Sequence, residues 1–449
     1  MNEPRGLSES NRGSTTGRNL TATGVILLVG GSVAKRRLFE CNLKRLNYDL
    51  VGIIHVVPRS LRSASHADSS CWDASIEISD ICERFRVIAI IPLIDSVVCQ
   101  CDTFCARLGL HGNDPATSIF RVDKERMQSA CRVAGIRFTL SERVSSLEEA
   151  INVWRIKFLG EPIVCKPARS GGGDGVQVCV SERDITAYMG KFLNAVNLER
   201  LRNTDIILQE MHRMNSEFVV NTVSTRGVHY ISDVWMSKSK RFGNVFLYDT
   251  QELVTRESEI TYTVIAYTRK VLTACGVRHG ACHTEVSVNI LEDGKVSDIC
   301  LIEVNARIAG EIRTDAILGW NRYDQIYWLL VSLFEGDRLQ TLNEFFTPSL
   351  NVWAVFLRNL IPNGTQCMSR EALKKIRALK SFVRFGRGLA FLNEISHLES
   401  AKISQVVVSK TVDLISSPGV VLLVGPSARE DAISIRNLES NSLYHNTMT

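Results

Sequence analysis

Alternating apolar and polar residues predict a hairpin of two strands near the middle of the chain. The first strand spans residues 281–290, and the second lies within residues 299–310. Between them, the dipeptide Asp293-Gly294 is typical of a tight hairpin turn. Alternate side chains share one face of a strand. On the apolar face we expect Val286, Val288, Ile290, Cys300, Ile302 and Val304, and on the polar face His283, Glu285, Ser287, Asn289, Glu303, Asn305 and Arg307.

The polar face of this hairpin presents oxygen ligands that suit a hard cation. Glu285, Glu303 and Asn305 offer carboxylate and amide oxygens, which favour Mg²⁺, an ion that also takes phosphate oxygens as ligands. A two-residue turn would place Glu285 opposite Ile302, on the wrong face. We therefore expect an odd-length loop or a β-bulge that sets Glu285 opposite Glu303. Two carboxylates held so close repel each other unless a cation lies between them.

Strand and helix patterns alternate in the first part of the chain. Apolar runs at 23–32, 48–57 and 84–95 predict buried strands, and a helical pattern follows the first of them. This alternation predicts a small parallel α/β domain of the Rossmann-like kind over residues 23–119. Its Gly30-Gly31 turn lacks the G-x-G-x-x-G pattern of dinucleotide-binding loops, and fits better a turn that faces a ligand at the carboxyl end of a strand.

The rest of the chain mixes helices with many strands. Apolar spacing predicts helices at 120–138, 146–160, 260–276, 326–336 and 369–381, and strands at 162–168, 206–211 and 217–240. Residues 418–431 predict a strand, a turn and the start of a helix. The Arg226-Gly227 dipeptide divides residues 217–240 into a pair of strands. Residues 1–22 are polar, lack the apolar segment of a secretory signal and predict a disordered tail. The last eighteen residues are also expected to be frayed.

Composition narrows the class of protein. A chain of 449 residues is too long for one compact core and predicts several domains. The net charge of +5 is small for this length, which argues against a dedicated nucleic-acid-binding protein. No apolar run is long enough to span a bilayer, so no membrane partner is expected. The 13 cysteines are scattered, which favours reduced thiols in the cytoplasm.

A lysine followed by a glycine-rich loop predicts an anion-binding site within residues 164–180. Lys166 ends a strand, and Gly171, Gly172, Gly173 and Gly175 follow before the next strand. Consecutive glycines let backbone N–H groups approach an anion without side-chain clashes. The Walker A pattern is absent, because the lysine precedes the glycines. A flexible hairpin loop with an incidental lysine is the alternative.

A third segment, residues 208–220, joins two predicted strands. Such a linker can present the backbone at Glu210 and Met211 to the edge of an adenine, while Glu217 can accept hydrogen bonds from ribose hydroxyls. Surface glutamates are common in proteins, so glutamates without a ligand are the alternative here.

Taken in order, these three segments resemble the ATP-grasp superfamily. The resemblance implies an ATP-grasp domain over residues 120–335 with a lid at roughly 160–212, and a strand-rich C-terminal domain over 336–449. The implied fold is a multidomain α/β and α+β protein. Lys124 and Lys166 would bind the nucleotide phosphates, Glu285, Glu303 and Asn305 would bind the metal, and Arg307 would contact an acyl phosphate. The remaining implied nucleotide-binding residues are Ser170, Gly171, Gly172, Gly173, Glu210, Met211 and Glu217.

Within the superfamily, His-Thr-Glu at 283–285 with Asn-Ala-Arg at 305–307 looks most like the carboxylate–amine ligases that join amino acids, including bacterial L-amino-acid (dipeptide) ligases. This resemblance implies ATP, Mg²⁺ or Mn²⁺, amino acids as substrates, an acyl phosphate, and ADP and phosphate as products. Homodimers are common in the superfamily and are an expectation here. One alternative is a carboxylase-like or nucleotide-biosynthetic ligase acting on another small acid, and another is a nucleotide-binding module with a decayed site.

Two of these residues have further alternatives. His283 would assist deprotonation of the attacking amine or orient a substrate, and the alternative is a packed, hydrogen-bonded histidine. Arg307 could instead pair with Glu311, one helical turn further along.

Overall fold

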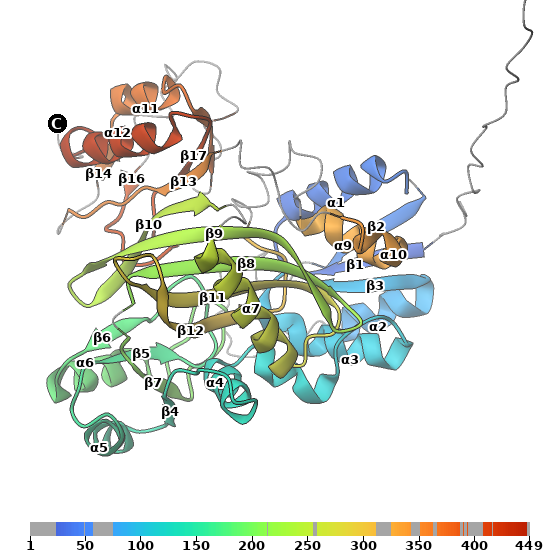
Figure 1. The fold of residues 1–449 in the computed structure, drawn as a ribbon, viewed down its shortest axis with the longest axis horizontal. Helices are drawn as coiled ribbons and strands as arrows, with labels where there is room; N and C mark the ends of the chain where they lie inside the picture. The colour runs from blue at the N-terminus through green and yellow to red at the C-terminus, as the bar shows by residue number, and fades with distance from the viewer. Residues whose placement is uncertain are drawn as a thin grey trace, which may run out of the picture.

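The computed structural model describes residues 24–48, 50–56, 75–212, 214–254, 258–310, 325–342, 351–361, 366–386, 389, 393, 407–414 and 416–446 (Figure 1). The tail predicted for residues 1–22 lies outside these ranges. No helix within them is both long and apolar enough to cross a membrane.

The N-terminal part is a three-stranded parallel sheet in the order β2-β1-β3, as predicted. Both faces of its central strand are buried: Ile26 and Leu28 pack on one side, and Leu27 and Val29 on the other. Its elements are β1 (Gly24–Val29), α1 (Val33–Arg45), β2 (Val51–Val56), α2 (Ser75–Arg84), β3 (Val87–Pro92), the 3-10 turn η2 (Asp95–Val97) and α3 (Val98–Leu108).

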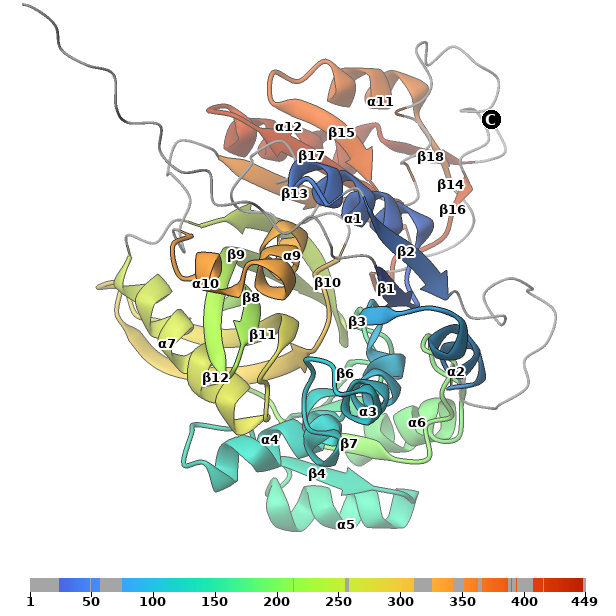
Figure 2. The same cartoon turned by 90° about the vertical axis from the view of Figure 1, so that its right-hand side faces the viewer.

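A second sheet follows, with four antiparallel strands in the order β4-β7-β5-β6. Trp154 and Tyr188, from the two helices that cover it, are buried against its apolar face. Figure 2 shows this unit below the large sheet. Its elements are η3 (Pro115–Arg121), α4 (Lys124–Val133), β4 (Ser141–Val144), α5 (Leu147–Lys157), β5 (Ile163–Pro167), β6 (Gln177–Cys179), α6 (Glu182–Phe192) and β7 (Ile206–Glu210).

An eight-stranded sheet forms the centre of the molecule, in the order β12-β11-β8-β9-β10-β13-β17-β15. On one face, Val264 and Val271 of α7 pack with Met127 of α4, whereas α9 lies between the other face and α1 (Figure 1). The first part of this unit comprises β8 (Ser216–Thr225), β9 (Val228–Phe242), β10 (Val245–Leu253), α7 (Glu259–Ala274), β11 (Gly280–Ile290), β12 (Val296–Asn305), α9 (Gln325–Phe334) and α10 (Gly336–Leu339).

The C-terminal elements extend this sheet and add a small three-stranded one in the order β16-β14-β18. They are β13 (Val352–Phe356), β14 (Gln366–Met368), α11 (Arg370–Arg377), β15 (Phe382–Gly386), β16 (Val407–Val408), β17 (Val420–Val424), α12 (Ala428–Asn441) and β18 (Tyr444–Asn446). The prediction that the last eighteen residues are frayed is wrong for those that the structure describes. Ala432, Ile435 and Leu443 are buried in the C-terminal core, and β18 pairs with β14, because short apolar residues at helical spacing recur within the polar sequence.

The central hairpin, β11 and β12, confirms the predicted register of its two glutamates. Glu285 lies directly opposite Glu303. The turn holds three residues, 292–294, with Gly294 at φ 83°, and Leu291 N donates to Lys295 O at 2.8 Å across it. A three-residue loop with glycine in the left-handed region is a common hairpin connection.

A bulge at Ile302 corrects one detail of the predicted faces. Glu285 pairs with Glu303 but Val286 pairs with Leu301, so Ile302 is the extra residue on β12. The predicted apolar face of Cys300, Ile302 and Val304 is therefore wrong. Leu301 and Val304 pack in the core, whereas Ile302 turns to the polar side, because one extra residue reverses the alternation along a strand.

Candidate active site

A cavity of about 160 Å³ opens where the four-stranded sheet faces the central hairpin. Its walls come from the start of α4, the end of β5 with the loop that follows it, and the strands β8, β9, β10, β11 and β12. Most predicted site residues line it, namely Lys124, Lys166, Ser170, Gly171, Gly172, Gly173, Glu217, Glu285, Glu303, Asn305 and Arg307. Glu210, Met211 and His283 do not.

Lys124 links α4 to the central hairpin. Asp123 caps the helix by accepting from the backbone N of Glu125 and Arg126, which fixes Lys124 at the first helical turn. The Lys124 ammonium donates to Ser170 O and lies 3.0 Å from Glu303 Oε1. Burial opposes its charge, but Glu303 and other carboxylates outweigh burial and raise the pKa of Lys124. Lys124 is therefore a fixed positive charge that contacts both the glycine loop and the hairpin.

Lys166, at the end of β5, is buried in the same cavity, but its pKa shifts in the opposite direction to that of Lys124. Burial and the neighbouring Lys124 lower the pKa of Lys166 to about 7, although Glu303 and Glu285 oppose the shift. Two ammonium groups facing one cavity repel each other, and an anion between them relieves that repulsion. The pair thus forms a cationic wall suited to phosphate oxygens.

The opposite wall is acidic, and one of its residues, Arg307, is paired with a carboxylate that the sequence analysis missed. Asp95, in η2 just beyond β3, accepts from Arg307 Nε at 2.7 Å. With its amide nitrogen facing them, Asn305 donates to Glu303 Oε1 at 3.0 Å and to both oxygens of Asp95 at 3.2 Å. The signal for Asp95 was its place at the carboxyl end of a parallel strand, where ligands commonly bind. Glu311, the alternative partner of Arg307, lies outside the described residues.

The oxygen donors of this wall fit a hard divalent cation. Burial and the nearby Glu285 and Asp95 raise the pKa of Glu303, against the opposing charge of Lys124. Such a cluster of carboxylates is short of positive charge, and an amide that turns its oxygen inward adds a further ligand. The donor set of Glu285, Glu303 and Asn305 therefore suits Mg²⁺.

Glu217 begins β8 and closes the cavity beside the hairpin. Burial and the charge of Glu285 raise its pKa to about 7, and Ser239 Oγ donates to its Oε2 at 3.2 Å. A carboxylate held in this state can accept hydrogen bonds from neutral hydroxyls, as a ribose offers.

His283 and Glu210 lie outside the cavity lining and contact other protein groups. The His283 ring lies 2.8 Å from Asn221 Oδ1 through Nδ1 and 3.2 Å from Glu285 Oε1 through Nε2. Glu210 accepts from Leu140 N at 2.8 Å and lies 3.1 Å from His212 Nε2. In this geometry His283 orients Glu285, and the Glu210 side chain holds the start of the linker to β8.

The glycine loop has the backbone that its sequence demands. Gly172, Gly173 and Gly175 all adopt positive φ, between 67° and 79°. Ser170 Oγ donates to Asp174 Oδ2 at 2.7 Å, and Gly172 O accepts from Leu414 N at 3.1 Å. The loop thus lies over the cavity and is held on its outer side by the C-terminal part of the chain.

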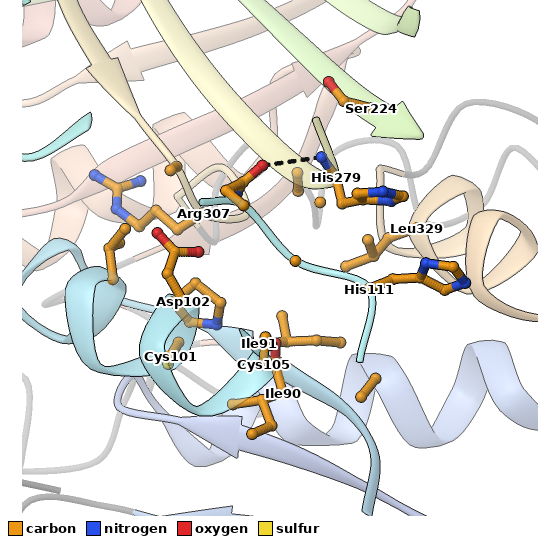
Figure 3. Close-up of a pocket in the computed structure, with 18 of the residues that line it drawn as sticks. Ile90, Ile91, Cys101, Asp102, Cys105, His111, Ser224, His279, Arg307 and Leu329 are labelled. Carbon is orange, nitrogen blue, oxygen red and sulfur yellow. Dashed lines mark hydrogen bonds between the residues drawn. The ribbon is translucent and has the colours of Figure 1, made fainter. Parts of the chain in front are cut away.

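A second, smaller cavity of about 60 Å³ lies between α3, β3 and the ends of β8 and β11 (Figure 3). Arg307 is the only predicted site residue that lines it. Its outer rim holds His111 and His279, whose rings stack at 4.9 Å, and burial lowers the pKa of His279 to about 4. Asp102 is already paired with Arg121 at 2.7 Å. This cavity therefore lacks the clustered charges of the larger one.

Comparisons with known proteins identify a family for the central part of the chain. Residues 159–315 match the family model of the ATP-grasp domain. Dapdiamide A synthase of Enterobacter agglomerans is 26% identical over 334 residues, which cover 73% of each protein. Alanine–anticapsin ligase of Bacillus subtilis is 22% identical over 276 residues, covering 56% of this chain and 57% of that protein.

Solved structures show the same fold. An L-amino acid ligase from Bacillus licheniformis superposes with a TM-score of 0.65 at 14% identity, covering 94% of this chain and 98% of its own. A carboxyaminoimidazole ribonucleotide synthase from Aspergillus clavatus, solved with ATP, has a TM-score of 0.62 at 14% identity and covers 93% and 98%. Residues 159–315 therefore match an ATP-grasp domain, and the chain is similar to proteins named as carboxylate–amine ligases.

Proposed function

We propose that this ATP-grasp ligase activates the carboxylate of an amino acid as an acyl phosphate and joins it to an amine, forming an amide or dipeptide. The observation that carries the proposal is one cavity with Lys124 and Lys166 on one wall and Glu285, Glu303 and Arg307 on the other. The relatives named as dapdiamide A synthase and alanine–anticapsin ligase support amide formation over the carboxylase-like alternative.

The reaction needs help because a carboxylate is a poor electrophile at neutral pH. The carboxylate attacks the γ-phosphorus of ATP, ADP leaves, and an amine then displaces phosphate from the acyl phosphate. Lys166 would bind the transferring phosphoryl oxygens and Arg307 the acyl phosphate, since both are buried cations facing the cavity. Mg²⁺ held by Glu285, Glu303 and Asn305 would neutralise further phosphate charge.

Water must be excluded, because it hydrolyses an acyl phosphate. Ser170 to Gly173 lie over the cavity and would act as the cover. We further propose that Glu217 binds the ribose, that the backbone at Glu210 and Met211 meets the adenine edge, and that His283 acts by orienting Glu285.

The test measures phosphate release from ATP over a panel of amino acids, with dipeptide detected by mass spectrometry. We expect release that depends on both Mg²⁺ and amino acid, and its loss in Glu303→Ala. Glu292→Ala is the matched control, since Glu292 is exposed at the turn of the same hairpin. If no amino acid stimulates release, the proposal is wrong, and stimulation by bicarbonate would indicate the carboxylase-like alternative instead.

Three further expectations belong to the proposal: a cytoplasmic location, small-molecule substrates without nucleic acid, and a homodimer. Light scattering during gel filtration measures the mass of the assembly, and a mass near 50.1 kDa would exclude the dimer.

A further inference from the structure

A short hairpin between α6 and β7 reaches towards the active site from the four-stranded sheet. Residues 194–203 fold back on themselves through Asn194 N to Asn203 O at 2.8 Å and Asn197 N to Leu201 O at 2.9 Å. At the tip, Arg200 N donates to Asn197 O at 2.9 Å and Arg200 adopts φ 60°. Asn197 Oδ1 accepts from the backbone N of Glu199 and of Leu201. The tip is thus a defined turn, with Glu199 at its apex.

This tip is bonded to the glycine loop. Asn197 Nδ2 donates to Arg169 O at 2.6 Å, and Leu198 N donates to Asp174 Oδ2 at 2.9 Å. Asp174 also accepts from Ser170 Oγ, within the loop that covers the cavity. Because the two segments share these bonds, the position of the cover and the position of Glu199 are coupled.

The Glu199 carboxylate lies against the glycine loop. Its Oε1 lies 3.5 Å from the position that a Cβ atom at residue 171, now Gly171, would occupy. Among the described residues, no group donates a hydrogen bond to this carboxylate. Burial and the charges of Asp95 and Glu303 raise the pKa of Glu199 to about 7, although Lys124 and Arg307 oppose the shift. The carboxylate therefore lies within electrostatic range of Lys124 and Arg307, but among the described residues no cation donates a hydrogen bond to it.

The balance of charge in the site indicates what that cation is. The acidic groups are Asp95, Glu199, Glu217, Glu285 and Glu303, and the basic groups are Lys124, Lys166 and Arg307. A divalent ion on the hairpin side would offset Glu285 and Glu303. Asp95 is already paired with Arg307. That leaves Glu217, which already accepts a hydrogen bond from Ser239 Oγ, and Glu199, on the wall that carries the cover, where a primary ammonium group would complete its pairing.

We propose that Glu199 binds the protonated amino group of an amino-acid substrate whose carboxylate lies towards Arg307. This inference rests on the proposed function and names the group that distinguishes an amino acid from a simple carboxylic acid. Since the tip is bonded to the glycine loop, binding of the ammonium group would also favour the covered state of the cavity.

The test compares Glu199→Gln, which keeps the shape and removes the charge, with the wild type. Each enzyme is assayed with an amino acid and with the carboxylic acid that lacks only its amino group. We expect the KM for the amino acid to rise roughly 10- to 100-fold, as for the loss of one charge-assisted hydrogen bond. The KM values for ATP and Mg²⁺, and that for the amine-free acid, should stay within about twofold. Glu161→Gln, at an exposed position of the same unit, is the control.

Two results would overturn the inference: an unchanged KM for the amino acid, or an equal rise in the KM for Mg²⁺, which would make Glu199 part of the metal site. Calorimetric titration of the amino acid into protein saturated with a non-hydrolysable ATP analogue separates this failure from that of the proposed function. Absence of phosphate release in the wild type refutes the proposed function, whereas equal amino-acid binding by wild type and Glu199→Gln refutes the role of Glu199 alone.

Discussion

Lys166 makes nucleotide binding depend on pH in a direction that the structure fixes. Burial and Lys124 lower its pKa to about 7 in the free protein, and bound phosphates would restore the ordinary value by supplying negative charge. Binding therefore takes up a proton, and affinity falls as the pH rises above 7. If only the charged form binds ATP, the charged fraction drops from about one half at pH 7 to about 1% at pH 9, so the Kd rises about 50-fold.

Calorimetry measures this proton directly. ADP or a non-hydrolysable ATP analogue is titrated at pH 8 in two buffers that differ in ionisation enthalpy, and we expect uptake of about 0.9 proton. Lys166→Arg is the control, because a guanidinium remains charged across this range. Glu217 and Glu199 also have raised pKa values, so the comparison with Lys166→Arg isolates the lysine. Negligible proton uptake by the wild type, or the same pH slope in Lys166→Arg, would refute the reasoning.

Three further substitutions test other parts of the structure. Asp95→Asn should lower kcat/KM about tenfold or more, since it removes the charged partner that holds Arg307, while the melting temperature changes little. Gly175→Ala should lower the free energy of unfolding in urea by about 1–3 kcal/mol, because φ at this position is 67° and the new methyl group would lie 2.9 Å from Pro167. Gly173→Ala is the control. It should lower the free energy of unfolding less, because no atom lies near its new methyl group, although φ there is 79°. Arg436→Ala should lower the free energy of unfolding in urea by about 3 kcal/mol, because Arg436 forms ion pairs at 2.8 Å with Asp249 of the large sheet and with Glu439 of α12. An unchanged midpoint of unfolding would show that these ion pairs do not stabilise the protein.

Much of the fold could be predicted because its local patterns agree with its tertiary packing. The parallel strands of the N-terminal sheet are short apolar runs buried on both faces, and the long helices keep regular apolar spacing. The turn between β8 and β9 could be predicted because Gly227 suits the positive φ, 83°, that it adopts there. The start of the C-terminal helix was predicted but its extent was missed, because its buried residues, such as Ala432 and Ile435, are sparse within a polar sequence.

The site was predictable where its residues belong to one continuous pattern. Glu285, Glu303 and Asn305 lie on one hairpin, and a parity argument alone required an odd-length loop or a bulge. The structure has a three-residue turn, with register shifts after Glu285 and after Asn289. Asp95 and Glu199 were not predicted. Asp95 ends an apolar strand pattern that does not show which residue at its end faces the site, and Glu199 stands in a turn without a periodic pattern. Both carboxylates belong to the candidate site only through the tertiary fold, which brings Asp95 into contact with Arg307 and Glu199 within its electrostatic range.

The contact between Lys124 and Glu303 has a consequence for the order of binding. Without ligands, the Lys124 ammonium occupies Glu303 Oε1 at 3.0 Å, an oxygen that a metal ion on the hairpin would need. A metal ion arriving alone would compete with that ammonium, and a nucleotide arriving alone would bring its phosphates against an uncompensated group of carboxylates. When both arrive together, the phosphates take Lys124 as a partner and the released oxygen becomes available to the ion. By linkage, each ligand must then raise the affinity for the other to the same degree, so the nucleotide and its magnesium ion should bind this site as one unit.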